Sequence, residues 1–187
     1  MTIDKRGKMT NNVETNTEAY APDYNISDWD FPLWSEILPG LWVGGTDDDD
    51  TLEFRTRLDQ DRNITKDDFD TVITLYAWAR PTDWLVEELR YGFYDSEISH
   101  IDMPTLINAA NHAHDAWVSG KRVLIRCQAG LNRSGLTATL VLMQAGFTAK
   151  DAIALLRAKR THHVLCNEQF ETFLLALDVA KEINEKE

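Results

Sequence analysis

The sequence predicts an α/β fold in which a central, mostly parallel β-sheet is flanked by helices and the C-terminal third is helical. Short apolar runs rich in β-branched residues, typical of buried strands, alternate with longer helical patterns as far as Cys127. Only helical segments follow. At 187 residues and 43% hydrophobic residues, the chain is long enough for one domain with a substantial core, predicted over residues 29–187.

The first part of the chain combines a polar tail with the start of this domain. Residues 1–28 are rich in Asn, Thr, Asp and Glu and show no apolar period, which predicts a flexible N-terminal tail. ILPGLWV then predicts a short hairpin that turns at Pro39-Gly40. The highly charged segment 46–68 predicts a surface helix and a loop.

The middle of the chain supplies the predicted core strands. FDTVITLYA (69–77) predicts a buried strand because of its β-branched and apolar run. TDWLVEEL (82–89) predicts a short helix, and RYGFYD (90–95) predicts a second strand or a loop. KRVLIRC (121–127) has the continuous apolar pattern of the most buried strand in a parallel sheet.

The remaining segments carry helix signals. Pro104 suits the first turn of a helix that Gly120 ends. Thr148 and Asp151 form the capped start of a later, amphipathic helix. The three helices predicted for the C-terminal third cover 133–146, 148–160 and 167–187.

Composition limits the classes of function. A net charge of −12 disfavours general affinity for nucleic acid or anionic membranes, so any phosphate chemistry must depend on a few local residues. No apolar run is long enough to span a membrane, and no secretory signal is apparent at the N-terminus. The two cysteines lack the spacing of a disulfide framework. These features predict a cytoplasmic protein.

The segment VLIRCQAGLNRSG (123–135) predicts a phosphate-binding loop between a strand and a helix. Loop N–H groups and the positive end of the helix converge on one point in such a turn. Gly130 allows the turn, and the guanidinium of Arg133 can hold two oxygens of one phosphate. Cys127 at the loop's mouth is then expected to be a thiolate.

These residues predict attack by Cys127 on a phosphate ester, which forms a phosphocysteine intermediate. Arg133 and the loop amides would stabilise the equatorial oxygens, and Ser134 could donate to the departing thiolate in the second step. The chemistry calls for no cofactor, and no His, Cys and Asp spacing matches a metal site. The predicted loop comprises Gln128, Ala129, Gly130, Leu131, Asn132 and Arg133.

CQAGLNRS resembles the Cys-x5-Arg-Ser signature of the protein tyrosine phosphatase superfamily, and the wider chain resembles its small dual-specificity branch. ILPGLWVGG, FDTVITL and AIALLRAKRTHHVLCNEQFETFLL carry the wider resemblance, over about residues 31–178. It implies a dual-specificity phosphatase-like fold and a phosphorylated protein or peptide as substrate, hydrolysed on phosphotyrosine alone or also on phosphoserine or phosphothreonine. The sequence leaves the oligomeric state open.

The mechanism also needs a general acid, because an alkoxide or phenolate leaves poorly without a proton. The resemblance implies an aspartate on a loop about thirty residues before the nucleophile. YGFYDSEISHID offers Asp95, Glu97 and Asp102. Asp95 lies 32 residues before Cys127, whereas Asp102 falls where a helix cap is expected. Asp95 is therefore the predicted acid.

Arg126 departs from the family pattern, which has histidine before the cysteine. One interpretation is an ion pair that fixes the edge of the sheet. The other is that Arg126 supplies positive charge to the thiolate. Cys166 is interpreted as a small core residue, and Asn167 resembles a structural asparagine of the family that caps a helix.

Two alternative functions remain open. GLNRSG also resembles the loop of RNA 5′-triphosphatases of this superfamily, although the acidic composition disfavours RNA as a ligand. The second alternative is a non-catalytic phospho-binding module. That class would be expected to lack the nucleophile or the arginine, and both Cys127 and Arg133 are present.

Overall fold

The computed structural model describes residues 2–3, 9–10, 31–46 and 63–184. Near the N-terminus, β1 (Thr2–Ile3) pairs with β2 (Met9–Thr10) in antiparallel fashion. Most of the predicted tail and most of the predicted helix and loop over 46–68 lie outside the described residues. Both therefore stay predictions.

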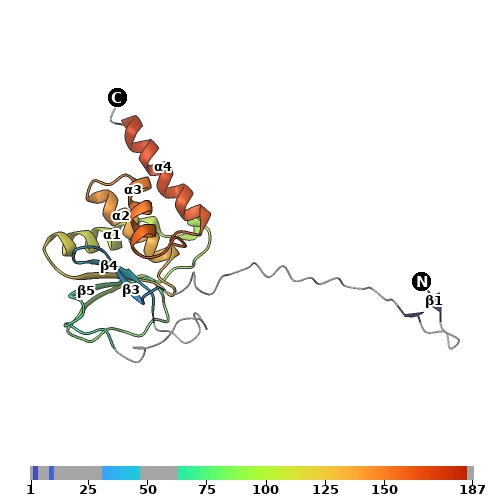
Figure 1. Ribbon diagram of the computed structural model, residues 1–187, viewed down its shortest axis with the longest axis horizontal. Coiled ribbons are helices and arrows are strands. Elements are labelled where there is room, and N and C mark those ends of the chain that lie inside the picture. Colours follow the sequence, from blue (N-terminus) through green and yellow to red (C-terminus); the bar gives the residue numbers. More distant parts are fainter. Residues whose placement is uncertain (1, 4–8, 11–30, 47–62, 185–187) are drawn as a thin grey trace.

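A five-stranded, mostly parallel sheet forms the centre of the domain, as predicted (Figure 1). Its strand order is β3-β4-β7-β5-β6, with β3 alone antiparallel to its neighbour. The central strand β7 is fully buried, which explains its unbroken apolar sequence. The strands are β3 (Trp34–Leu38), β4 (Leu41–Gly44), β5 (Thr71–Thr74), β6 (Glu87–Arg90) and β7 (Val123–Arg126).

The hairpin predicted in ILPGLWV is confirmed as β3 and β4. Gly40 has a φ of +81°, a left-handed conformation that glycine adopts without steric cost. The Gly40 N–H also donates to the Glu36 carboxylate at 3.0 Å, which closes the turn. This hairpin forms one edge of the sheet and places Gly44 beside the end of β7.

The helix predicted over 82–89 is wrong. The segment forms a turn followed by the edge strand β6, which pairs in parallel with β5. Backbone hydrogen bonds continue this pairing beyond the strand, from Tyr91 N–H to the Thr74 carbonyl oxygen at 2.9 Å. An isolated helix of two turns is barely stable, so pairing with the free edge of β5 outweighs the local helical pattern.

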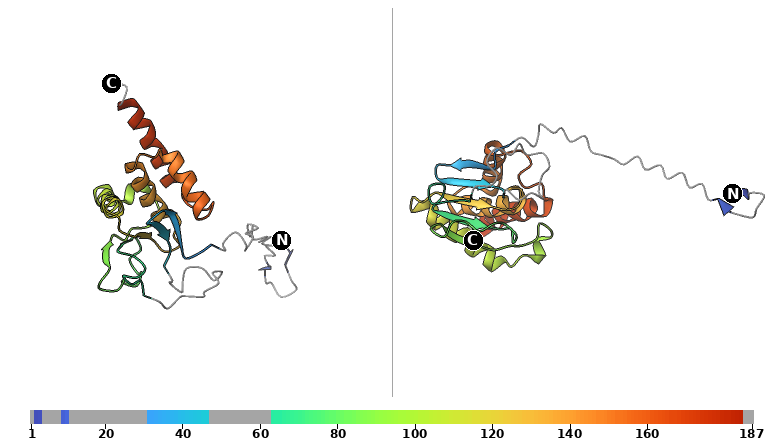
Figure 2. Two further views of the ribbon diagram at one scale, coloured as in Figure 1. Left: turned by 60° about the vertical axis from the view of Figure 1, so that its left-hand side comes forward. Right: turned by 90° about the horizontal axis from the view of Figure 1, so that it is seen from below.

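The helices predicted from Pro104 onward are confirmed. The cap predicted at Thr148 is present, because its side chain accepts a hydrogen bond from the Asp151 N–H at 3.0 Å. Figures 1 and 2 show α4 projecting from the body of the domain toward the C-terminus. The helices are α1 (Met103–Val118), α2 (Asn132–Gln144), α3 (Ala149–Lys159) and α4 (Glu168–Asn184).

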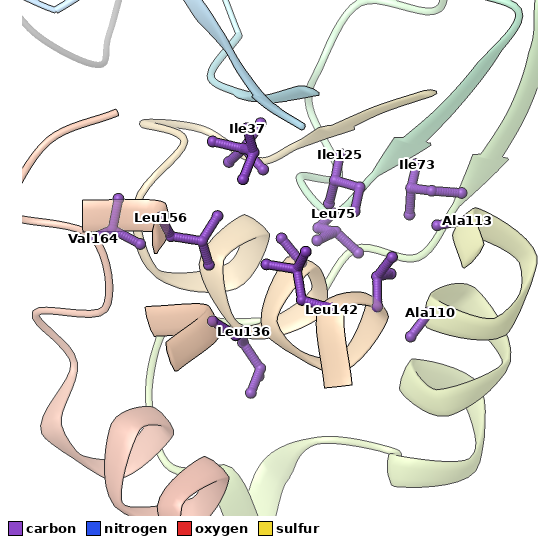
Figure 3. Close-up of a cluster of buried hydrophobic side chains, with 14 of the residues drawn as sticks. Ile37, Ile73, Leu75, Ala110, Ala113, Ile125, Leu136, Leu142, Leu156 and Val164 are labelled. Carbon is purple, nitrogen blue, oxygen red and sulfur yellow. The ribbon is translucent and has the colours of Figure 1, made fainter. Parts of the chain in front are cut away.

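The main core lies between one face of the sheet and α1, α2 and α3 (Figure 3). Ile37, Ile73 and Ile125 from the strands meet Leu142 of α2 and Leu156 of α3 there. A smaller aromatic cluster covers the opposite face. Its members are Trp34, Trp42, Ile64, Phe69, Val72, Val86 and Leu124.

Neighbouring residues of β7 face opposite layers, because side chains alternate along a strand. Ile125 belongs to the helical core, whereas Leu124 belongs to the aromatic cluster. This alternation determines where the two residues at the end of the strand point: Cys127 joins the helical core, and Arg126 lies on the opposite side.

Candidate active site

The loop between β7 and α2 folds closely around the Cys127 sulfur. Gly130 has a φ of +74°, and a Cβ at this position would collide with the Gly44 carbonyl group and with the guanidinium of Arg160. Only glycine fits this position. The turn directs the Gly130 N–H inward, where it donates to Cys127 Sγ at 3.3 Å.

Cys127 is 2% exposed, and the fully buried Ser134 places its Oγ 3.4 Å from the Cys127 Sγ. A backbone amide and a hydroxyl thus both lie within hydrogen-bond distance of this one sulfur, beside the first turn of α2.

Arg133 is held from one side and keeps donors for a ligand. Its Nη1 donates to the Phe93 carbonyl oxygen at 3.0 Å and to the Leu75 carbonyl oxygen at 3.4 Å. Nη2 makes a long hydrogen bond of 3.4 Å to Gln128 Oε1, and Nε has no partner among the described residues. The residue is only 7% exposed. A buried guanidinium with an unused N–H needs an acceptor, which a bound phosphate oxygen would supply.

The acid candidate Asp95 lies on an exposed segment between β6 and α1, yet it contacts the loop directly. Its Oδ2 accepts a hydrogen bond from Asn132 Nδ2 at 3.0 Å, and its Oδ1 accepts one from Asn167 Nδ2 at 3.0 Å. Asn132 is the first residue of α2 and adjoins Arg133. The structure therefore brings Asp95 to the predicted loop across 32 residues of sequence.

The carboxylates of the other two acid candidates form hydrogen bonds with residues close to them in the chain. Asp102 occupies the expected N-cap position before α1, but its side chain makes no hydrogen bond to the helix backbone; its carboxylate accepts from the Thr105 hydroxyl at 2.5 Å. Glu97 accepts from the Ser99 hydroxyl at 3.3 Å. The structure describes no contact between either carboxylate and the loop.

Arg160, at the end of α3, is the loop contact that sequence reasoning missed. Its Nε donates to the Gly130 carbonyl oxygen at 2.6 Å and its Nη2 to the Ala129 carbonyl oxygen at 3.2 Å. Its Nη1 reaches the Val43 carbonyl oxygen on β4 at 3.2 Å. Arg160 is 6% exposed, so it braces the back of the loop against the hairpin. In the sequence it looks like an ordinary basic residue at a helix C-terminus.

Arg126 points away from the thiol and forms a buried ion pair. Its Nη2 lies 2.9 Å from Glu88 Oε1 on β6, and its Nε donates to the Thr74 hydroxyl at 2.9 Å. Burial raises the pKa of Glu88, but hydrogen bonds from Thr74, the Thr82 N–H and Arg126 outweigh burial and lower the pKa below its usual value. The structure favours the interpretation of Arg126 as an ion pair that fixes the sheet edge.

Arg126→Met is therefore expected to lower the free energy of unfolding by about 3 kcal/mol, because it leaves a mostly buried carboxylate without its buried partner. Urea denaturation measures this change. Arg90→Met is the matched control, since Arg90 Nη1 pairs with the same Glu88 oxygen at 2.8 Å but is more exposed, and about 1 kcal/mol or less is expected. Unchanged unfolding together with lost turnover in Arg126→Met would instead favour a role at the thiolate.

The structure also tests the predictions made for Cys166 and Asn167, which lie near the loop. The interpretation of Cys166 as a core residue is wrong, because Cys166 is exposed and its Sγ donates to Asn132 Oδ1 at 3.3 Å. It follows the tight bend at Leu165, where φ is 60°, which turns the next side chain outward. Asn167 does precede α4, and its Oδ1 accepts from the Gln169 N–H at 3.1 Å, which caps the helix.

The part of the chain that the structure describes holds no group of three or more His, Cys, Asp or Glu side chains suited to a metal ion. Within the same residues, every helix is too short or too polar to cross a membrane. The run of aspartates at 47–50 lies outside the described residues.

Comparisons with known proteins agree with this architecture. A family model described as the catalytic domain of dual specificity phosphatases matches residues 84–179. The comparison with curated protein sequences finds no match. A mouse dual specificity phosphatase crystallised with zinc tungstate has a TM-score of 0.62 at 19% identity, over 82% of this chain and 91% of that one.

Two further solved structures are similar. Human DUSP28 has a TM-score of 0.61 at 16% identity, over 81% of this chain and 96% of that one. PTPMT1 in complex with PI(5)P has a TM-score of 0.57 at 19% identity, over 83% and 99%. At these identities the likenesses show the fold, whereas the family model covers just over half of the chain, including the Cys-x5-Arg-Ser loop. The chain thus belongs to the dual specificity phosphatases of the protein tyrosine phosphatase superfamily.

Proposed function

We propose that this protein hydrolyses phosphomonoesters of proteins, on phosphotyrosine or with dual specificity, through a phosphocysteine intermediate. The observation that carries the proposal is the Nε of the buried Arg133, which has no partner among the described residues, on the same loop as a thiol that already accepts the Gly130 N–H. An anion bound on the guanidinium and the loop amides would be held in front of a nucleophile.

In the first step, Cys127 Sγ attacks phosphorus, an S–P bond forms and the ester P–O bond breaks. Asp95 gives its proton to the leaving oxygen, so the product leaves as a neutral alcohol or phenol. In the second step, a water attacks phosphorus and gives a proton to Asp95, while the S–P bond breaks. Ser134 donates a hydrogen bond to the sulfur as it departs as thiolate, and inorganic phosphate is released.

Aromatic side chains near Arg133 support an aryl ester as the preferred substrate. The guanidinium lies 5.3 Å from the Tyr76 ring centroid, and the Tyr76 ring lies 5.6 Å from that of Trp78. Trp78 is 70% exposed and is thus available to a phosphotyrosine ring. Cys127 and Cys166 are both free thiols, which accords with the cytoplasmic location that we also propose.

Two other phosphate substrates fit less well. PTPMT1 was crystallised with a phosphoinositide, but residues 128–132 of this chain carry no lysine to meet additional phosphates. RNA 5′ ends would meet a protein of net charge −12, which disfavours the phosphate contacts that supply most RNA affinity.

Parallel assays on a phosphotyrosine peptide, a phosphoserine peptide and an RNA with a 5′-triphosphate test the proposal. Hydrolysis of the phosphotyrosine peptide is expected to be fastest. Faster hydrolysis of the RNA would replace the proposed substrate class. Binding of phosphopeptide without any hydrolysis would identify a phospho-binding module.

Asp95→Asn is expected to lower kcat for a phosphotyrosine peptide by about 10²–10³-fold, because an amide cannot supply the proton that the leaving oxygen needs. Steady-state kinetics measure this loss. Asp102→Asn is the matched control, since the Asp102 side chain makes no hydrogen bond to the helix backbone and asparagine keeps an acceptor for the Thr105 hydroxyl. Its turnover is expected to stay close to that of the wild type. The reverse order of losses would move the acid to Asp102.

A further inference from the structure

The proposed acid lies on a segment with no regular secondary structure, between β6 and the 3₁₀ turn Ile98–His100. Asp95 itself is exposed, so packing does not hold its carboxyl group in place. Two side-chain amides do: Asn132 Nδ2 and Asn167 Nδ2 each donate to one carboxyl oxygen at 3.0 Å. These hydrogen bonds come from elements that lie 37 and 72 residues further along the chain.

We propose that Asn132 and Asn167 are positioning residues that hold Asp95 for proton transfer and tie the acid to the phosphate-binding loop. Neither acts on the substrate directly. The inference rests on the proposed function, and it adds a device that makes the position of the acid depend on the position of the loop.

Both asparagines are themselves held by further hydrogen bonds, so the position of the loop determines that of Asp95. Asn132 Oδ1 accepts from the Asn167 N–H at 3.0 Å, which joins the two residues. Asn167 Nδ2 also donates to the Ser96 carbonyl oxygen at 3.0 Å, next to Asp95 in the chain. Asn132 immediately precedes Arg133, whose Nη1 donates to the Phe93 carbonyl oxygen on the same acid-bearing segment. The segment is thus fastened to the start of α2 at both Phe93 and Asp95.

Neutral donors suit a carboxyl group that must both release and take a proton. A lysine or arginine beside Asp95 would strongly favour the carboxylate and oppose the protonated form that the first step needs. An amide N–H orients the group with a much smaller electrostatic bias. The pair therefore orients both carboxyl oxygens of Asp95 without placing a charged group beside them.

Asn→Asp substitutions separate this role from a structural one, because aspartate keeps the acceptor oxygen and loses the donor. Asn132→Asp retains an acceptor for the Asn167 N–H, and Asn167→Asp retains the cap on α4. Asn111→Asp is the control for added charge, since Asn111 Oδ1 likewise accepts a side-chain hydrogen bond, from Gln144 Nε2 at 2.9 Å on the surface.

The dependence of kcat on the leaving group distinguishes a positioning role from a merely structural one, which would affect all esters equally. Phenyl phosphate needs a proton on its leaving oxygen, whereas dinitrophenyl phosphate needs almost none. Asn132→Asp and Asn167→Asp are each expected to lower kcat for phenyl phosphate by about 10²-fold, the cost of a misplacement of about 1 Å. For dinitrophenyl phosphate, Asn167→Asp and Asn111→Asp should stay close to wild type. Because Asn132 lies in the phosphate-binding loop, its variant is judged by the ratio of kcat on phenyl phosphate to kcat on dinitrophenyl phosphate, which should fall by about 10²-fold.

The decisive measurement is a double-mutant cycle with Asp95→Asn. In that background, Asn167→Asp is expected to cause no further loss on phenyl phosphate, because there is no acid left to position. Asn132→Asp, in the phosphate-binding loop, should then lose no more on phenyl phosphate than it does on dinitrophenyl phosphate. Larger losses in that background, or equal losses on both esters, would overturn the positioning role. If one variant fails to fold, the other arm of the pair carries the same test.

The failure of this inference is distinguishable from that of the proposed function. A wild-type protein that hydrolyses neither ester overturns both. Normal turnover by the wild type, a selective loss in Asp95→Asn and wild-type kinetics in the asparagine variants would overturn the positioning role alone.

Discussion

Cys127→Ser is expected to lose turnover of a phosphotyrosine peptide by about 10⁴-fold or more, the scale of loss when a covalent nucleophile is removed. Serine keeps a hydrogen-bonding atom near the Gly130 N–H, so the loop can still form. Its hydroxyl stays protonated at neutral pH, however, and the two groups that bond to this position among the described residues, the Gly130 N–H and the Ser134 hydroxyl, are not bases. The variant should therefore bind substrate and fail to form the covalent intermediate.

Rapid quenching with radiolabelled substrate measures the covalent step directly. The wild type should show phosphate attached to the protein, and Cys127→Ser should show none while it retains the phosphopeptide in a binding assay. Cys166→Ser is the matched control, because that thiol is exposed and a serine can still donate to Asn132 Oδ1. Covalent phosphate in Cys127→Ser would mean that another residue is the nucleophile.

Arg133→Lys is expected to lower kcat by about 10³-fold and also to raise KM. The arginine uses Nη1 to grip the Phe93 and Leu75 carbonyl oxygens and keeps the remaining donors for the phosphate. Lysine has one ammonium group, which cannot bind the two carbonyl oxygens and the phosphate at the same time. The equatorial oxygens would then lose their paired donors as the bonds to phosphorus change.

Steady-state kinetics on an aryl phosphate measure both constants. Arg157→Lys is the matched control, because Arg157 also makes a two-pronged contact, to Glu171 at 2.8 and 3.0 Å, and the structure describes no contact between it and the loop. Its turnover should stay close to wild type. An Arg133→Lys variant with wild-type kcat would show that the fork does not stabilise the transition state.

The sequence predictions are correct where the structure depends on interactions between near neighbours in the chain, and wrong where it depends on contacts with other elements. The hairpin, β7, α2 and the start of α3 are predicted correctly because turn residues, apolar runs and caps act within a few residues. The segment 82–89 is predicted wrongly because its conformation depends on β5, which is distant in sequence. Cys166 is predicted wrongly because one left-handed residue, Leu165, sets its direction.

The residues of the candidate active site likewise fall into those that local patterns indicate and those that they do not. The succession of strand, glycine turn and helix around Cys127 to Ser134 could be predicted directly, because each of these elements is specified by neighbouring residues. Asp95 could be placed only through a resemblance, since nothing local links it to the loop. No pattern pointed to Arg160, whose role depends on its burial between the loop and the β3–β4 hairpin.

The sequence by itself determined the mixed α/β class and the Cys-x5-Arg-Ser cradle, because both depend on periodicity and on contacts between near neighbours. Only the tertiary structure decided that Arg126 turns from the thiol to Glu88, that Arg160 braces the loop and that Asn132 and Asn167 hold Asp95. The physical reason is that each of these contacts joins side chains from elements far apart in the sequence, whose partners are chosen by packing and by the satisfaction of buried polar groups.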